Sequence, residues 1–205
     1  GWDTTRAGTQ NTGTITIKGA GLVDLDAAAL NAAVQTVDAS GNTGGVHIAA
    51  SSQTDFTFTG GSGNDRFQAD VALSTTTGSA GSVNAGAGTD RLRIDTSADI
   101  TAAIGALYTN FEVLQVEDSV SVDMDHISGL TAVRINQVGG ATGVTDLTAT
   151  QAGNITIVGS GAGAVTMAVK GAATIGQLDT VTLANNDGLA AVNDLVLTAP
   201  VMAGV

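Results

Sequence analysis

The chain consists of short segments in which apolar and polar residues alternate, and glycine- or asparagine-rich turns separate these segments. In 14–18 (TITIK), 56–59 (FTFT) and 91–95 (RLRID), every second side chain is apolar, so one face of a β-strand would be buried. Strands are expected at 14–18, 35–38, 46–49, 56–59, 66–71, 91–95, 112–117, 120–124, 132–136, 154–158, 165–169, 180–183 and 194–198. Strands at this spacing predict a β-sandwich, a β-barrel or a stack of solenoid coils.

Composition favours the solenoid. Only 3% of the 205 residues are aromatic, which suits a thin core better than a globular one. The chain has no cysteine, so it forms no disulfide, and it has no apolar run long enough to span a membrane. We expect one elongated domain over residues 1–205, with one candidate boundary near 139–143. Because the chain begins at Gly1 without a signal peptide, it is expected to be a fragment of a larger protein or to be secreted by another route.

Two segments interrupt the strand pattern. Residues 26–34 (DAAALNAAV) are alanine-rich and begin with an aspartate that can cap a helix. Residues 97–111 carry Ile100, Ile104, Leu107 and Phe111 at helical spacing. A short helix is expected in each segment.

The charge of the chain limits its partners. There are 7 Lys and Arg residues against 19 Asp and Glu residues, which gives a formal net charge of -12. The sequence shows no basic patch, and phosphate groups would be repelled. We therefore expect no nucleic-acid partner and no direct membrane insertion.

One glycine-rich motif carries specific chemistry. Residues 60–68 (GGSGNDRFQ) match the nonapeptide G-G-x-G-x-D-x-U-x of calcium-binding β-rolls. Its glycines permit tight turns that present carbonyl oxygens, and its aspartate supplies a hard anionic oxygen. The apolar position, Phe67, would anchor the following strand in the core.

The motif recurs at 85–93 (AGAGTDRLR), 25 residues later, with Ala85 in place of the first glycine. A coil of that length would stack the two turns on one edge, so that one Ca²⁺ could be shared between them. The predicted metal ligands are carboxylates of Asp65 and Asp90 and carbonyls of Gly61, Gly63, Gly86 and Gly88. The alternative is that these are glycine turns capped by aspartate that hold no metal. Weaker echoes occur at 38–45, where Asp38 or Asn42 could be ligands, at 139–146 and at 159–163. For each of them a turn without metal is the preferred interpretation.

These motifs, with their flanking segments 37–46, 109–118 and 128–136, resemble the RTX-type surface-layer and adhesin proteins of Gram-negative bacteria. The resemblance covers roughly residues 35–170. It implies a right-handed parallel β-solenoid, stabilised by Ca²⁺, exported by type I secretion and attached to the cell surface. Only two near-consensus repeats are present, so few ions are expected.

The resemblance also implies a structural function: a calcium-dependent building block that assembles with its own copies into an extracellular lattice. A cell-surface polysaccharide is a further candidate partner. The alternatives are an RTX adhesin domain or a C-terminal module for secretion and folding of an attached protein. The apolar segment 195–205 (LVLTAPVMAGV) is expected either to close the last coil or to pack against another copy.

Other functions find less support in the sequence. No G-x-S-x-G, H-E-x-x-H or P-loop motif occurs, and His47 and His126 have no evident partner, so an enzyme is not expected. Asp123, Asp125 and His126 form a D-x-D-H cluster, which we interpret as a solvated loop. Thr-x-Thr pairs such as Thr14/Thr16 are spaced too irregularly for an ice-binding face.

Overall fold

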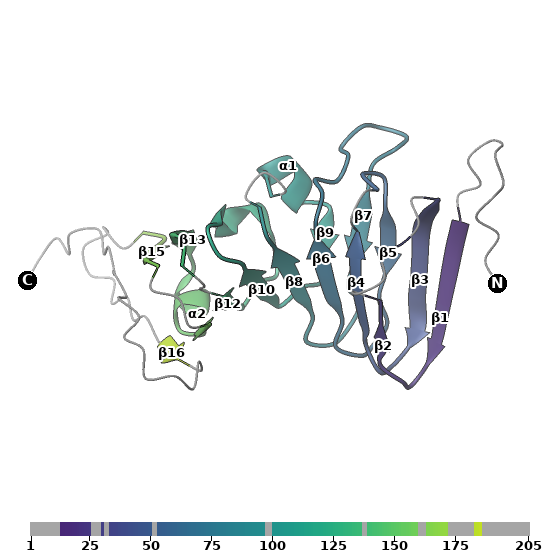
Figure 1. Cartoon of the computed structure of the whole chain (residues 1–205), viewed down its shortest axis with the longest axis horizontal. Coiled ribbons are helices and arrows are strands. Elements are labelled where there is room, and N and C mark those ends of the chain that lie inside the picture. Colours follow the sequence, from purple (N-terminus) through teal and green to yellow (C-terminus); the bar gives the residue numbers. More distant parts are fainter. Residues whose placement is uncertain are drawn as a thin grey trace, which may run out of the picture.

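The protein is a parallel β-solenoid in this computed structural model, which describes residues 13–25, 30, 33–50, 53–96, 100–136, 139–159, 163–171 and 183–185. Successive strands alternate between sheets (Figure 1). The even-numbered strands form one sheet along the described stack, and the odd-numbered strands form a second sheet from β1 to β9 and a third from β11 to β15. Every strand pairing is parallel. The predicted solenoid class is therefore confirmed over the described residues.

Three sheets run along the stack. The five-stranded sheet contains β1 (Gly13–Gly19), β3 (Val34–Asn42), β5 (Thr57–Thr59), β7 (Ser82–Asn84) and β9 (Tyr108–Thr109). The eight-stranded sheet contains β2 (Val23–Asp24), β4 (Val46–Ala50), β6 (Arg66–Ala69), β8 (Arg91–Ile94), β10 (Val113–Val116), β12 (Ala132–Asn136), β14 (Ile155–Val158) and β16 (Leu183–Asn185). The three-stranded sheet contains β11 (Ser121–Asp123), β13 (Thr142–Leu147) and β15 (Val165–Val169).

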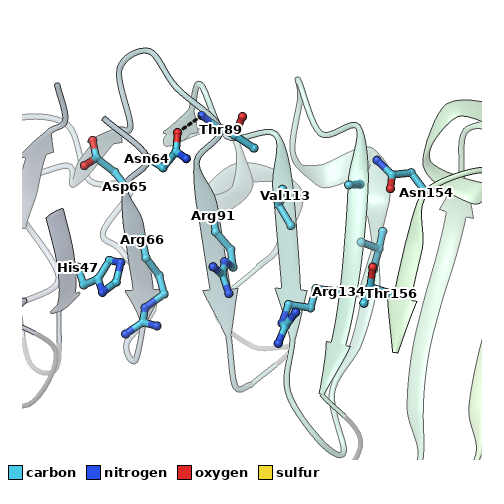
Figure 2. Close-up of a pocket in the computed structure, with 12 residues that line it drawn as sticks. His47, Asn64, Asp65, Arg66, Thr89, Arg91, Val113, Arg134, Asn154 and Thr156 are labelled. Carbon is cyan, nitrogen blue, oxygen red and sulfur yellow. Dashed lines mark hydrogen bonds between the residues drawn. The ribbon is translucent and has the colours of Figure 1, made fainter. Parts of the chain in front are cut away.

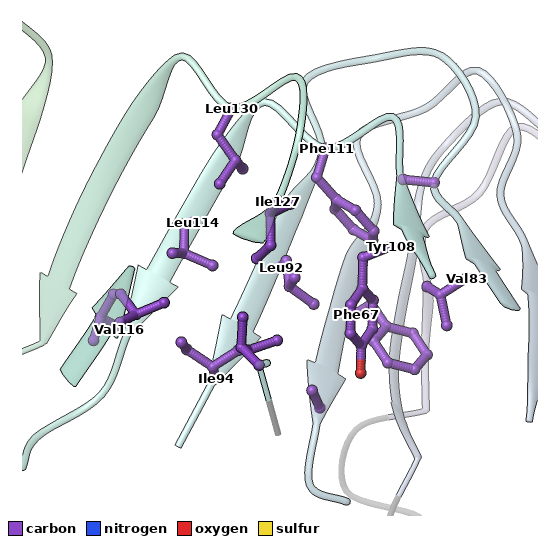
Figure 3. Packing of buried hydrophobic residues seen from close by; sticks show 14 of the residues in the cluster. Phe67, Val83, Leu92, Ile94, Tyr108, Phe111, Leu114, Val116, Ile127 and Leu130 are labelled. Carbon is purple, nitrogen blue, oxygen red and sulfur yellow. The ribbon is translucent and has the colours of Figure 1, made fainter. Parts of the chain in front are cut away.

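The core consists of apolar rows that run from coil to coil. In the eight-stranded sheet, register places one buried residue per strand directly opposite the next, in the row Ile48, Phe67, Leu92, Leu114, Val133 and Ile155. Aromatic rings fill the middle of the stack, where Phe67 lies 5.9 Å from Phe58 and 6.0 Å from Tyr108 between ring centroids (Figure 3). Such contacts add to the hydrophobic burial that stabilises each coil.

The helix predicted at 97–111 is mostly wrong. The helix α1 covers only Ala102–Gly105, and Tyr108–Thr109 form strand β9. Tyr108 is buried opposite Val83 and against Phe67, so the solenoid core overrides the local helical spacing. Gly105 also lies so close to His126 that a Cβ there would meet the His126 carbonyl.

Several other boundaries differ from expectation. The sequence pattern does not predict strands β2, β7, β9 and β13, nor the one-turn helix α2 (Ala149–Ala152), which Thr148 caps. A 3₁₀ helix, η2 (Met124–His126), follows β11 where the strand is expected to continue. The segment 26–34 falls largely outside the described residues, and Val34 is the first residue of β3. The eight-stranded sheet includes strands on both sides of 139–143, and the candidate boundary there stays a prediction.

The expected strand at 194–198 and the apolar segment 195–205 also lie outside the described residues. In the part of the chain that the structure describes, no helix has the length and apolar character needed to cross a membrane.

Candidate functional site

The two glycine motifs lie one on the other, as their 25-residue spacing predicts. Backbone hydrogen bonds join them: Gly60 N–H donates to Asn84 O at 2.7 Å, and Ala87 N–H donates to Gly61 O at 2.8 Å. The carbonyl of Gly61 approaches Gly86, and that of Gly63 approaches Gly88, so closely that a Cβ on either later glycine would overlap them. The glycines thus allow neighbouring coils to stack without side chains between them.

The two aspartates are buried beside these turns and accept backbone N–H groups from the preceding coil. Asp65 Oδ1 accepts from Val46 N–H at 2.6 Å, and Asp90 Oδ1 accepts from Asp65 N–H at 2.6 Å. Asp65 is 2% exposed and Asp90 is 0% exposed. Each carboxylate therefore stabilises the turn of the preceding coil.

A third carboxylate continues this arrangement, and the sequence pattern does not single it out. Glu112 Oε2 accepts from Asp90 N–H at 2.8 Å, 22 residues along the chain. We call Asp65, Asp90 and Glu112 the carboxylate ladder. Glu112 has no glycine motif before it. It directly precedes Val113, and the register Arg66–Arg91–Val113 places Glu112 at the position that Asp65 and Asp90 hold in their own coils. Alignment of the strands, rather than of the glycines, would have identified it.

The ladder concentrates negative charge where water is excluded. The pKa of Asp90 is raised to about 7, first by burial and then by the neighbouring carboxylates of Asp65 and Glu112, against the lowering effect of the Asp65 N–H. Burial also raises the pKa of Asp65, although N–H groups of Val46 and Gly61 act in the opposite direction. Both groups are costly to ionise in the folded protein.

The oxygens present are of the kind that Ca²⁺ prefers. Asp90 Oδ2 is buried and has no hydrogen-bond partner, so it is free to face a cation. Both oxygens of Asp65, in contrast, already accept N–H groups, from Val46 and from Gly61 at 3.1 Å. Within the described residues, no three His, Cys, Asp or Glu side chains are grouped as metal ligands. Carbonyls of the stacked glycine turns would therefore have to supply much of a calcium shell.

Two of the three weaker echoes are accounted for by hydrogen bonds within the protein, and the third, 159–163, lies mostly outside the described residues. At 38–45, Asn42 Oδ1 accepts from Gly44 and Gly45 N–H, and its amide donates to Gly21 O at 3.0 Å. At 139–146, the carboxylate of Asp118 accepts from Gly139 and Gly140 N–H. In both turns, a side-chain oxygen of the protein accepts the backbone N–H groups of the glycines.

The acidic and histidine side chains of the D-x-D-H cluster also have partners within the protein. Asp123 caps η2 by accepting from Asp125 N–H at 2.9 Å, and His126 Nε2 lies 3.6 Å from Asp123 Oδ2. Asp125 pairs with Lys170. The interpretation of this segment as a surface loop agrees with these partly exposed ion pairs.

The expectation that the chain has no basic patch is wrong. Arg66, Arg91 and Arg134 lie on strands of the eight-stranded sheet with their side chains on its outer face, and His47 lies beside them (Figure 2). The three arginines are 25 and 43 residues apart in sequence, so no local run reveals them. One sequence feature could have indicated part of this patch: an arginine, Arg66 or Arg91, directly follows the aspartate in each glycine motif.

Comparison with protein-family models, with curated proteins and with solved structures found no match to this chain. The resemblance to RTX surface proteins therefore stays a prediction, and the geometry described above is the basis for what the chain does.

Proposed function

We propose that the chain is a structural building block of a bacterial surface layer, a β-solenoid that Ca²⁺ stabilises and that assembles with its own copies outside the cell. The observation that carries this proposal is the carboxylate ladder beside two stacked glycine turns. Three acidic side chains follow one another from coil to coil there, each accepting a backbone N–H of the preceding coil, and one buried oxygen, Asp90 Oδ2, has no donor.

A cation at this place would stabilise the folded chain for an electrostatic reason. It would offset the repulsion among Asp65, Asp90 and Glu112 and would favour the ionised form of Asp90. The chain as a whole carries a charge of -12, which opposes compaction in the absence of cations. Extracellular calcium modules bind with Kd values on the order of 10⁻⁴–10⁻³ M, so calcium levels outside a cell would suffice.

Self-assembly is supported by the architecture of the stack. The strands β1 and β15 lie at opposite ends of the described part (Figure 1), and among the described strands β1 pairs only with β3. A solenoid end leaves strand edges that must be capped, continued or joined to a neighbour. Contacts between unlike ends are heterologous and can propagate into a lattice.

The test is light scattering at rising protein concentration, with excess Ca²⁺ and with EDTA. We expect the mean particle mass to grow with concentration in Ca²⁺ and to stay that of a monomer in EDTA. A monomer under both conditions would reject the lattice function. The chain would then be better described by the alternatives, an RTX adhesin domain or a secretion and folding module.

A further inference from the structure

The outer face of the eight-stranded sheet gathers arginines from three coils. Arg66 on β6 lies directly opposite Arg91 on β8, and Arg134 lies two strands further on β12. With Arg93, four of the chain's 7 Lys and Arg residues share this face. In a protein of net charge -12, such a concentration of positive charge requires an explanation.

Arg93 is neutralised within the protein. Arg93 Nε donates to Glu117 Oε1 at 2.7 Å. Burial acts to raise the pKa of Glu117, but hydrogen bonds from Asn136, Gln115 and Arg93 outweigh it and lower that pKa, so Glu117 stays ionised. Glu117 is thus the counter-charge of Arg93.

Arg91 has a neutral hydrogen-bond partner instead. Arg91 Nη1 donates to Gln115 Oε1 at 2.9 Å, and Gln115 is the residue directly opposite Arg134 in the register of β10 and β12. The buried Nε of Arg134 has no hydrogen-bond partner. Burial lowers the pKa of Arg91, and the charges of Arg134 and Arg66 lower it further. The guanidinium groups are therefore close enough to repel one another.

These arginines line a hollow of about 440 Å³ on the surface of the sheet. Its walls include His47, Asn64, Thr89 and Thr156, which can donate hydrogen bonds (Figure 2). Asp65 also borders the hollow, but its two carboxylate oxygens accept the N–H groups of Val46 and Gly61. His47 Nδ1 lies 3.7 Å from Oδ2 of Asp24, which is outside the lining of the hollow.

We propose that this hollow binds the anionic groups of an acidic polysaccharide, with Arg66, Arg91 and Arg134 as the charged contacts. Guanidinium groups bind carboxylate and phosphate in a planar, two-bond geometry. Neighbouring strands are spaced about 4.8 Å apart. Arg66 and Arg91 lie side by side in one register row, and Arg134 lies two strands further in the adjacent row, so the positive charges spread over several strands and suit a ligand with repeated charged units.

A polysaccharide fits better than a nucleic acid. Single-stranded nucleic acid is held by stacking on exposed aromatic side chains as well as by charge. In the described part of the chain, the aromatic residues lie in the core: Phe56, Phe58, Phe67, Tyr108 and Phe111. The net charge of -12 would also repel a polymer as densely charged as DNA.

The experiment measures binding of hyaluronan oligosaccharides by calorimetry, with dextran as the neutral polymer and single-stranded DNA as the other polyanion. The variant Arg91→Gln/Arg134→Gln removes two charges, and Lys18→Gln/Lys170→Gln removes two cations on β1 and after β15. We expect the arginine variant to lose about tenfold or more in affinity. The lysine variant should change the affinity by less than about twofold, since those charges are away from the hollow.

Three results would overturn the proposal: equal binding of dextran and hyaluronan, tighter binding of DNA, or equal losses in the two variants. Loss of self-association in the arginine variant, without polysaccharide binding by the original protein, would instead assign this face to a second copy. Calcium-dependent melting of the same variants is measured in parallel. An unchanged calcium response with lost polysaccharide binding separates this site from the proposed surface-layer function.

Discussion

At the scale of single residues, the aspartates of the two glycine motifs have a structural role whether or not they hold a metal. Each accepts a backbone N–H that the stacked coil has buried, and an unsatisfied buried donor costs about 1–3 kcal/mol. The second oxygen of Asp90 has no such role. It is therefore the atom at which a purely structural interpretation and the calcium interpretation differ most.

The raised pKa of Asp90 predicts a specific pH dependence in EDTA. The folded-state pKa is about 7, above the ordinary value of 3.8, so the folded state holds its proton to higher pH than the unfolded state does. This contribution to stability is fully present below about pH 4 and is lost as pH rises to about 7. The variant Asp90→Asn keeps an oxygen that can accept from Asp65 N–H but carries no charge.

We therefore expect the free energy of unfolding of the original chain, measured in urea, to fall relative to that of Asp90→Asn when the pH rises from 5 to 8. Asp38→Asn is the matched control, because hydrogen bonds from Ser40 lower the pKa of partly exposed Asp38 and leave it ionised throughout this range. A difference between the original chain and Asp90→Asn that does not change with pH would contradict the assignment of a buried, costly charge.

At the scale of elements, the glycine turns set the spacing between coils. Gly86 has a φ of 93°, and a Cβ there would overlap the carbonyl of Gly61 in the coil below. Gly78 has a nearly equal φ of 90° but has open space around it. The two glycines therefore separate the cost of backbone strain from the cost of lost stacking.

The variants Gly78→Ala and Gly86→Ala test this separation by urea unfolding. Strain of a left-handed backbone alone should cost Gly78→Ala about 1–2 kcal/mol. Gly86→Ala should cost about 1–3 kcal/mol more, because the two turns must move apart. Equal losses would mean that the close stacking of the turns contributes nothing to stability.

The sequence predicted those elements that local pattern determines. Alternation located β4, β6, β8, β10, β12 and β14, and the 25-residue spacing placed the two turns together. It failed where packing decides: Tyr108–Thr109 lie within the segment predicted to be helical yet form a strand, because Tyr108 completes the aromatic stack on Phe67. The arginine face and Glu112 were missed because strand register, which the sequence does not show, brings those residues together.

At the scale of the whole molecule, the solenoid joins two opposed charge features. The two aspartates of the carboxylate ladder are buried at the turns and Glu112 is partly buried, and the arginines line the outer face of the eight-stranded sheet. Arg66 and Arg91 each directly follow a ladder aspartate in the sequence. One repeat thus supplies both a candidate cation site and a candidate anion site, and stacking of coils multiplies each into a row.

The most direct test of the calcium-stabilised solenoid is thermal unfolding with excess Ca²⁺ and with EDTA, for the original chain and for Asp90→Asn. A ligand bound only by the folded state adds about 2.7 kcal/mol at 100 times its Kd, which raises the midpoint of a chain of this size by about 5–10 °C. We expect that shift in the original chain and a much smaller one in Asp90→Asn, with Mg²⁺ unable to replace Ca²⁺. Equal midpoints in Ca²⁺ and EDTA for the original chain would contradict the account, and the ladder would then be a set of structural hydrogen bonds alone.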